Sequence, residues 1–118
     1  MGTEAEHQTK ASHNHAFLAT IAEAYPDWQT TVAFYVAVQL VEARLAKSGL
    51  HCPDHHRRKQ AVREKFNRIS AAYNKLYNAS LVARYDPPGD VLPADRVRTE
   101  LIDKALGDIL KFFATAAS

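Results

Sequence analysis

The chain has 118 residues, of which 47% are apolar and 24% are charged, proportions that are typical of one globular domain and exclude a wholly disordered chain. Its longest largely apolar run, Val32–Leu40, is too short to cross a bilayer, and the first residues lack the basic and apolar segments of a signal peptide. A single cysteine, Cys52, excludes an internal disulfide framework and a four-cysteine zinc site. We therefore expect one cytoplasmic domain over residues 1–118, with no membrane association.

The first predicted element is a helix that ends before Pro26. Four apolar residues recur at helical spacing and define it: Phe17, Leu18, Ile21 and Tyr25. The sequence does not mark where this helix begins, so we expect residues 1–12 to be frayed.

The second predicted element covers residues 28–48, which contain neither glycine nor proline. Its β-branched and aromatic residues would also suit a strand, but its length exceeds that of an ordinary strand and favours a helix. Asp27 is expected to cap the N-terminus of this helix, and Gly49 is expected to end it. Because the segment is apolar on nearly all sides up to Glu42, it is predicted to lie at the centre of the fold.

The third predicted element starts near Asp54, a second potential N-cap, and ends at the sequence DPPG of residues 86–89. Its inward-facing residues alternate at spacings of four and three: Val62, Phe66, Ile69, Tyr73, Leu76, Ser80 and Ala83. This seam predicts one long helix, or two collinear helices broken near Asn67. A last helix is predicted over residues 94–116. The fold class is therefore all-α, an antiparallel bundle of four to five helices.

Positive charge is concentrated in one part of the chain. Residues 55–84 contain eight lysines and arginines but a single acid, Glu64, whereas the segments on either side carry a net negative charge. Such a segment can attract the phosphates of a nucleic acid or a nucleotide. The alternative is a solvated helix face that meets acidic neighbours.

Histidines and arginines cluster around the start of the third element. His51, Cys52, His55 and His56 could ligate a metal, but no second ligand pair follows at zinc-finger spacing, so we expect neither a metal nor another cofactor. His55 and Arg58 both lean toward one end of the bundle. They could hold a phosphate there, or they could hydrogen-bond to the preceding loop.

A second polar cluster lies later on the same element. Its five members are Tyr73, Tyr77, Ser80, Arg84 and Tyr85. The first four share one side of a helix at spacings of four, three and four. With His55 and Arg58 they form our predicted binding set, although the cluster could equally join this helix to the second helix or to a partner subunit. On a continuous helix Arg58 and Arg84 would lie about 39 Å apart, so one site that uses both requires a break or a second subunit.

Three stretches of the sequence carry a family resemblance. Residues 34–43 (FYVAVQLVEA) combine aromatic residues with alanine, His55 or His56 opens the next helix ahead of Phe66, and residues 76–87 (LYNASLVARYDP) place a tyrosine after an alanine. These features resemble the HEPN family (higher eukaryote and prokaryote nucleotide-binding), whose small members are helical bundles. The resemblance spans residues 13–87 and implies a homodimer. Many members carry arginine where Ser80 stands and aspartate where Arg84 stands, so the role of that pair does not transfer.

The resemblance implies three functions. We favour a non-catalytic module that binds RNA, a nucleotide or a protein partner through its basic helix. The first alternative is a toxin-type ribonuclease, in which His51 or His55 acts as acid or base while Arg44 or Arg58 stabilises negative charge. Arg44 and His51 have the spacing of the family's ribonuclease motif. About one arginine–histidine pair with this spacing is expected by chance in a sequence of this composition. The second alternative is a structural partner of a nucleotidyltransferase.

Overall fold

Helix α1 covers Glu4–Leu18 in the computed structural model, which describes residues 2–116. It begins with a capping box: the Thr3 hydroxyl oxygen accepts a hydrogen bond from the Glu6 backbone N–H at 3.1 Å, and the Glu6 carboxylate accepts one from the Thr3 backbone N–H at 2.9 Å. The helix therefore begins earlier than the apolar spacing indicated, within the segment 1–12 that we expected to be frayed. The apolar pattern missed this start because the capping residues are polar.

The end of α1 also differs from the prediction. The Thr20 hydroxyl and the Thr20 backbone N–H both donate to Phe17 O, at 2.7 and 2.8 Å, and close a turn after Leu18. Ile21 and Tyr25 therefore lie beyond the helix to which their spacing assigned them.

Helix α2 covers Pro26–Lys47. It starts with a proline, whose fixed φ suits the first helical position, so Asp27 lies within the first turn and is not the N-cap that we predicted. The predicted stop at Gly49 is confirmed: this glycine has a φ of 75°, and the Leu50 N–H donates back to Leu45 O at 2.8 Å. A glycine adopts this left-handed conformation without the steric cost of a side chain.

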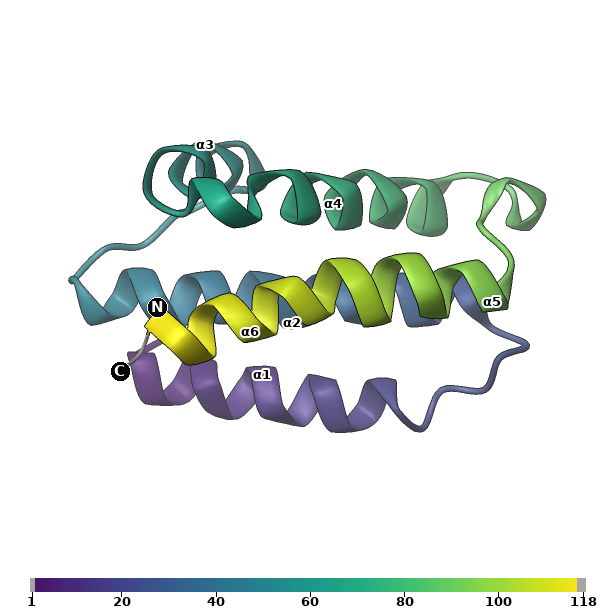
Figure 1. Ribbon diagram of the computed structural model, residues 1–118, viewed down its shortest axis with the longest axis horizontal. Helices are drawn as coiled ribbons and strands as arrows, with labels where there is room; N and C mark the ends of the chain where they lie inside the picture. The colour runs from purple at the N-terminus through teal and green to yellow at the C-terminus, as the bar shows by residue number, and fades with distance from the viewer. Residues whose placement is uncertain (1, 117–118) are drawn as a thin grey trace.

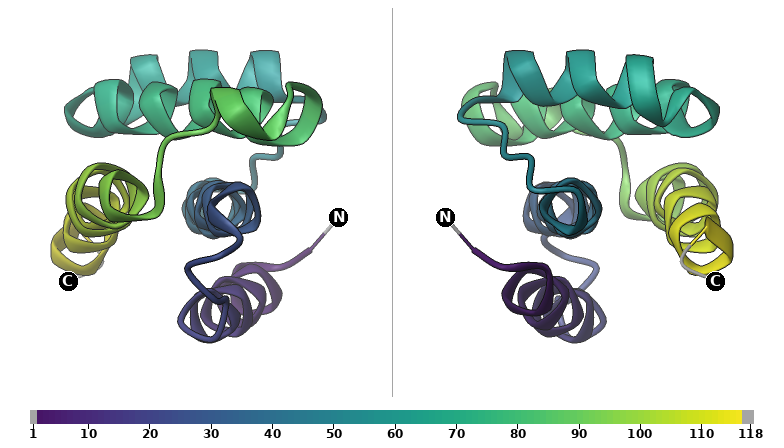
Figure 2. Two further views of the ribbon diagram at one scale, coloured as in Figure 1. Left: turned by 90° about the vertical axis from the view of Figure 1, so that its right-hand side faces the viewer. Right: turned by 90° about the vertical axis from the view of Figure 1, so that its left-hand side faces the viewer.

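Helix α2 lies at the centre of the fold, as its apolar character predicted. Figure 2 shows it nearly end-on, with α1 on one side, α3 and α4 on the opposite side and α6 along one flank. Its fully covered side chains form the middle of the core: Ala33, Phe34, Val36, Ala37, Val41 and Ala43.

The predicted third element is divided into α3 (His55–Lys65), the 3₁₀ turn η1 (Asn67–Ile69) and α4 (Ser70–Tyr85). The break falls near Asn67 as expected, but the two helices are not collinear. In Figure 1, α3 is seen almost end-on while α4 runs along the long axis of the molecule. Phe66, with φ −128° and ψ 49°, leaves the helical conformation and turns the chain. The prediction of collinear helices was wrong because a single non-helical residue redirects the backbone.

The C-terminal part of the chain follows the 3₁₀ turn η2 (Pro88–Asp90). Three consecutive helical segments form one run: α5 (Ala94–Arg96), the π-helical stretch η3 (Val97–Leu106) and α6 (Gly107–Ala116). The run spans the predicted segment, and Gly107 does not interrupt it. Its π-helical middle was not anticipated by the sequence.

The described residues contain helices and turns but no strand, which confirms the all-α class. Successive long helices alternate in direction, with α1 and α4 running one way and α2 and α6 the other (Figure 1). The bundle measures about 40 × 25 × 24 Å. Within residues 2–116, no helix combines the length and the apolar character needed to cross a membrane.

Candidate functional site

A buried ion pair joins α2 to the first turn of α3. Arg58 Nε and Nη2 donate to one oxygen of the Glu42 carboxylate at 3.1 and 3.0 Å, and the two side chains are only 10% and 4% exposed. Arg58 Nη2 also donates to Cys52 O at 3.3 Å, in the loop before α3. Arg58, which we considered as a phosphate ligand, therefore directs its donors into the protein and toward the preceding loop.

His55 lies beside this ion pair, on the first residue of α3. Asp54 caps the helix as predicted, because its side chain accepts a hydrogen bond from the Arg57 backbone N–H at 2.8 Å. The His55 Nδ1 atom accepts from Arg58 Nη1 at 2.9 Å, which places the proton of the neutral ring on Nε2. Burial, followed by the positive charges of Arg58 and Arg84, lowers the pKa of His55. The ring is therefore held in its neutral form.

The turn at Phe66 brings α3 over α4 and places His55 against the middle of that helix. The His55 ring packs against both Phe34 and Tyr77, with centroid distances of 5.5 and 5.7 Å. The positive charge of Arg84, on the same side of α4 as Tyr77, contributes to the lowered pKa of His55. The break in the third element thus brings the two predicted clusters together within one chain, without a second subunit.

The four predicted residues of α4 divide into buried and accessible members. Tyr73 and Ser80 are fully buried, and burial raises the pKa of Tyr73 to about 12. The Ser80 hydroxyl donates to Tyr77 O at 2.7 Å and accepts from Arg84 Nη2 at 3.2 Å, while Arg84 Nε donates to Ser80 O at 3.2 Å. Ser80 therefore positions the Arg84 guanidinium, whereas Tyr77 and Arg84 themselves remain partly accessible.

Cations alternate with aromatic rings on the outside of this region. The Arg84 guanidinium lies 6.0 Å from the Tyr35 ring centroid and 5.2 Å from that of Tyr85, and Lys59 Nζ lies 5.0 Å from that of Tyr77. We call the following set the aromatic–basic surface: Tyr35, His55, Lys59, Tyr77, Arg84 and Tyr85. It draws its members from α2, α3 and α4.

Half of this surface lay outside the predicted binding set. Lys59 was hidden among the neighbouring cations of residues 57–59, which the sequence alone does not rank. Tyr35 sat in an apolar run that pointed only to the core, although it is 37% exposed. Tyr85, at 73% exposure, belonged to the second sequence cluster with Arg84, but it was left out of the binding set because it is not on the helix side that the other four members share.

Arg44 and His51, which have the spacing of the ribonuclease motif, contact different residues. Arg44 donates to Phe113 O at 3.3 Å and lies 5.6 Å from the Phe113 ring centroid, so it faces α6. His51 Nδ1 lies 3.8 Å from Glu42 Oε2, and its side chain is 35% exposed. Arg44 therefore contacts α6, whereas His51 lies beside Glu42 of α2.

The sequence offered His51, Cys52, His55 and His56 as an alternative set of metal ligands. Among residues 2–116, no three histidine, cysteine or acidic side chains form a group that could hold a metal ion. Burial and the nearby Glu42 carboxylate raise the pKa of the Cys52 thiol. His56 lies apart from this loop, in the lining of a small cavity between α3 and α4.

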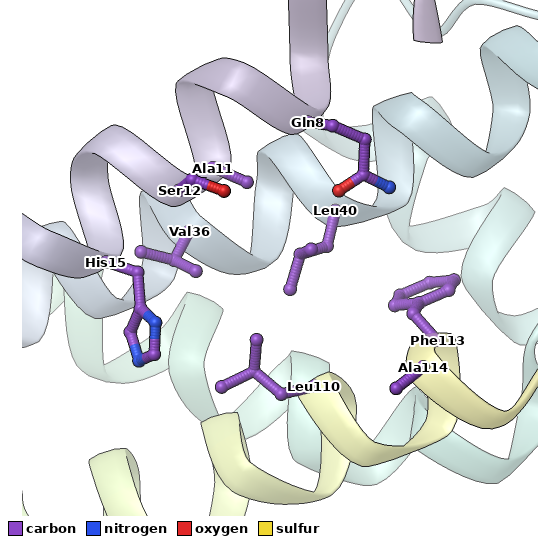
Figure 3. A pocket seen from close by; sticks show the side chains of 9 residues that line it. All are labelled: Gln8, Ala11, Ser12, His15, Val36, Leu40, Leu110, Phe113 and Ala114. Carbon is purple, nitrogen blue, oxygen red and sulfur yellow. The ribbon is translucent and has the colours of Figure 1, made fainter. Parts of the chain in front are cut away.

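An apolar cleft of about 330 Å³ opens between α1, α2 and α6 (Figure 3). Val36 and Leu40 of α2 form its base, and Leu110 and Phe113 of α6 form one wall. His15 is the one titratable side chain in its described lining. A cleft with a single titratable group and no lining cation offers no acid–base pair and no charge for a phosphate, so the aromatic–basic surface is the stronger candidate.

Comparison of the chain with protein-family models, with curated proteins and with solved structures found no match to any of them. The HEPN resemblance therefore stays a prediction that rests on the sequence features described above.

Proposed function

We propose that the protein binds single-stranded RNA through the aromatic–basic surface and does not cleave it. The observation that carries this proposal is the position of Arg84 between the rings of Tyr35 and Tyr85, next to the pairing of Lys59 with Tyr77. Aromatic faces stack on unpaired bases, and cations between them neutralise the phosphates of the strand. A surface that alternates both groups suits a single strand better than a duplex, whose bases are already stacked.

The charge distribution supports the same ligand. The aromatic–basic surface belongs mainly to residues 55–84, which contain eight lysines and arginines and one acid. Binding driven by phosphate neutralisation releases counterions and weakens as salt rises. The proposal therefore requires an affinity that falls steeply with ionic strength.

The environment of the catalytic candidates favours binding without cleavage. Arg58 is committed to Glu42, and Arg44 faces Phe113 on α6. The His55 Nδ1 atom is occupied by Arg58, and the lowered pKa of this ring disfavours the protonated form that a general acid needs. A cleavage site needs a histidine and an arginine that meet at the same scissile phosphate.

Fluorescence anisotropy of a labelled single-stranded RNA, titrated at low and moderate salt, tests the proposal. We expect salt-sensitive binding, which Arg84→Ala and Tyr85→Ala each weaken about tenfold, the order of one lost stacking or charged contact. Arg96→Ala is the matched control, because Arg96 is an exposed arginine whose partner, Glu100, is 2.6 Å away and outside the surface. An equal loss in all three variants, or binding that salt does not affect, would overturn the assignment.

A denaturing gel of the endpoint samples separates this proposal from its alternatives. Intact RNA supports the binding module. Cleavage would instead favour a ribonuclease, to be tested with the double variant His51→Ala and His55→Ala. If no RNA binds at either salt, the surface is to be tested for a protein partner, with light scattering to detect the homodimer that the HEPN resemblance implies.

A further inference from the structure

A small cavity lies where the exposed face of α3 meets α4, next to the aromatic–basic surface. It has a volume of about 220 Å³ and is lined by five polar side chains: His56, Lys59, Gln60, Arg63 and Asn74. The first four come from successive turns of α3, at positions that share one helix face, and Asn74 faces them from α4. Each of these side chains can donate hydrogen bonds into the cavity.

The two cations of this cavity have no carboxylate partner among the residues that the structure describes. Within residues 2–116, neither Lys59 nor Arg63 forms an ion pair, and no acid belongs to the described lining. Some surface cations of the chain are paired, such as Lys75 with Glu100 at 3.3 Å and Lys104 with Asp108 at 3.2 Å. The cavity thus combines two uncompensated positive charges with three further hydrogen-bonding groups from two helices.

We propose that this cavity binds a phosphate monoester, namely the terminal phosphate of an RNA strand. A monoester carries close to two negative charges and three free acceptor oxygens at neutral pH. That charge matches the two positive charges of Lys59 and Arg63, and the three oxygens can accept hydrogen bonds from His56, Gln60 and Asn74. A backbone diester carries one negative charge, so it would offset only one of the two cations of the cavity.

The position of Lys59 connects the cavity to the proposed RNA surface. Its ammonium group lies 5.0 Å from the Tyr77 ring centroid, and the same side chain lines the cavity. A strand bound along the aromatic–basic surface would therefore meet the cavity at Lys59, the residue that the two share. This inference rests on the proposed function, because it makes the strand end part of what the surface recognises.

Three RNAs of one sequence test the inference: one with a 5′-phosphate, one with a 3′-phosphate and one with hydroxyl groups at both ends. We expect one phosphorylated RNA to bind about tenfold tighter than the hydroxyl form, the effect of one added charge-assisted hydrogen bond. Arg63→Gln is expected to abolish this preference, while it lowers the affinity for the hydroxyl RNA no more than the loss of another exposed cation of residues 55–84 does. The matched control is Arg68→Gln, which removes an exposed arginine outside the cavity and is expected to keep the preference.

Titration with inorganic phosphate, followed by the side-chain amide NMR signals of Gln60 and Asn74, tests the cavity without RNA. We expect both signals to shift in the wild type and to remain unchanged in Arg63→Gln. Equal affinity for the three RNAs would overturn the assignment to a strand end, and the absence of phosphate-induced shifts would overturn the anion site itself. If no RNA binds while phosphate still shifts the signals, the proposed function fails and the anion site stands.

Discussion

Glu42 and Arg58 form an ion pair that is almost completely shielded from water, with Arg58 Nη2 3.0 Å from Glu42 Oε1. Glu42 lies on the central helix α2, and Arg58 lies on the first turns of α3. The same guanidinium donates to His55 Nδ1 and to Cys52 O. One buried pair therefore fixes the loop, the start of α3 and the orientation of the histidine on the aromatic–basic surface.

Arg58→Ala is expected to destabilise the fold by about 3–5 kcal/mol, because it leaves the Glu42 carboxylate buried without its partner. Urea unfolding monitored by circular dichroism measures this loss. Arg57→Ala is the control: its side chain is 68% exposed and pairs with an exposed Asp54, so its loss should stay within about 0.5 kcal/mol. The double variant Glu42→Leu, Arg58→Met is expected to be more stable than Arg58→Ala, because neither charge is then buried alone. Equal losses for Arg58→Ala and Arg57→Ala would contradict a buried pair.

The stability of the protein is expected to depend on the protonation of His55. Burial and the charges of Arg58 and Arg84 hold the folded-state pKa of this ring below its usual value of about 6.5. Below about pH 6.5 the unfolded chain binds more protons at this residue than the folded chain does. The contribution of His55 to the free energy of unfolding is therefore fully present above about pH 6.5, and it is lost as the pH falls through the folded-state pKa.

We therefore expect the free energy of unfolding to fall more steeply between pH 7 and pH 5 in the wild type than in His55→Gln. The glutamine carbonyl can still accept from Arg58 but does not titrate. Urea unfolding at several pH values gives both profiles, and His13→Gln, at an exposed position of α1, should retain the wild-type slope. Parallel profiles for the wild type and His55→Gln would show that His55 is not the titrating group.

The helices could be predicted from the sequence because their signals are local. Gly49 ends α2 through its own left-handed conformation, and Asp54 caps α3 through its own side chain. The prediction of Asp27 as the N-cap was wrong because the helix starts one residue earlier, at Pro26. The fixed φ of Pro26 suits the first helical position. The direction of α3 could not be predicted, because it depends on how Phe66 packs against residues more than forty positions away.

The candidate site was only partly predictable for a related reason. Spacing identified the helix side that carries Tyr77 and Arg84, but burial within that side depends on the neighbouring helices. Ser80 is covered completely, and Arg58 turns inward, because Glu42 on another helix offers a partner for its charge. Tyr35 joined the surface only because α4 places Arg84 beside it.

Phe66 is expected to hold the turn between α3 and α4. Its ring packs edge-on against Phe112 and Phe113 of α6, at centroid distances of 6.1 and 5.3 Å. Because the side chain is only partly buried, Phe66→Ala should cost about 2–3 kcal/mol, below the range for a fully buried phenylalanine. Thermal or urea unfolding checks the value against Phe17→Ala, whose side chain is 52% exposed and whose loss should be smaller. If the two variants lose the same stability, the aromatic cluster does not anchor the turn.

Cys52 is expected to react slowly with thiol reagents in the folded protein. Burial, followed by the negative charge of Glu42, raises the pKa of its thiol, and the thiolate is the reactive form. As the chain has one cysteine, the rate of modification by a disulfide reagent at pH 8 reports on this site alone. The native protein should react more slowly than the protein unfolded in urea. The variant Glu42→Gln should react faster than the wild type, because it removes one cause of the raised pKa. Circular dichroism checks that this variant is folded. Equal rates in the native and unfolded states would mean that Cys52 is open to solvent in the native state. Such a result would contradict a loop that is fixed by the hydrogen bond from Arg58 to Cys52 O.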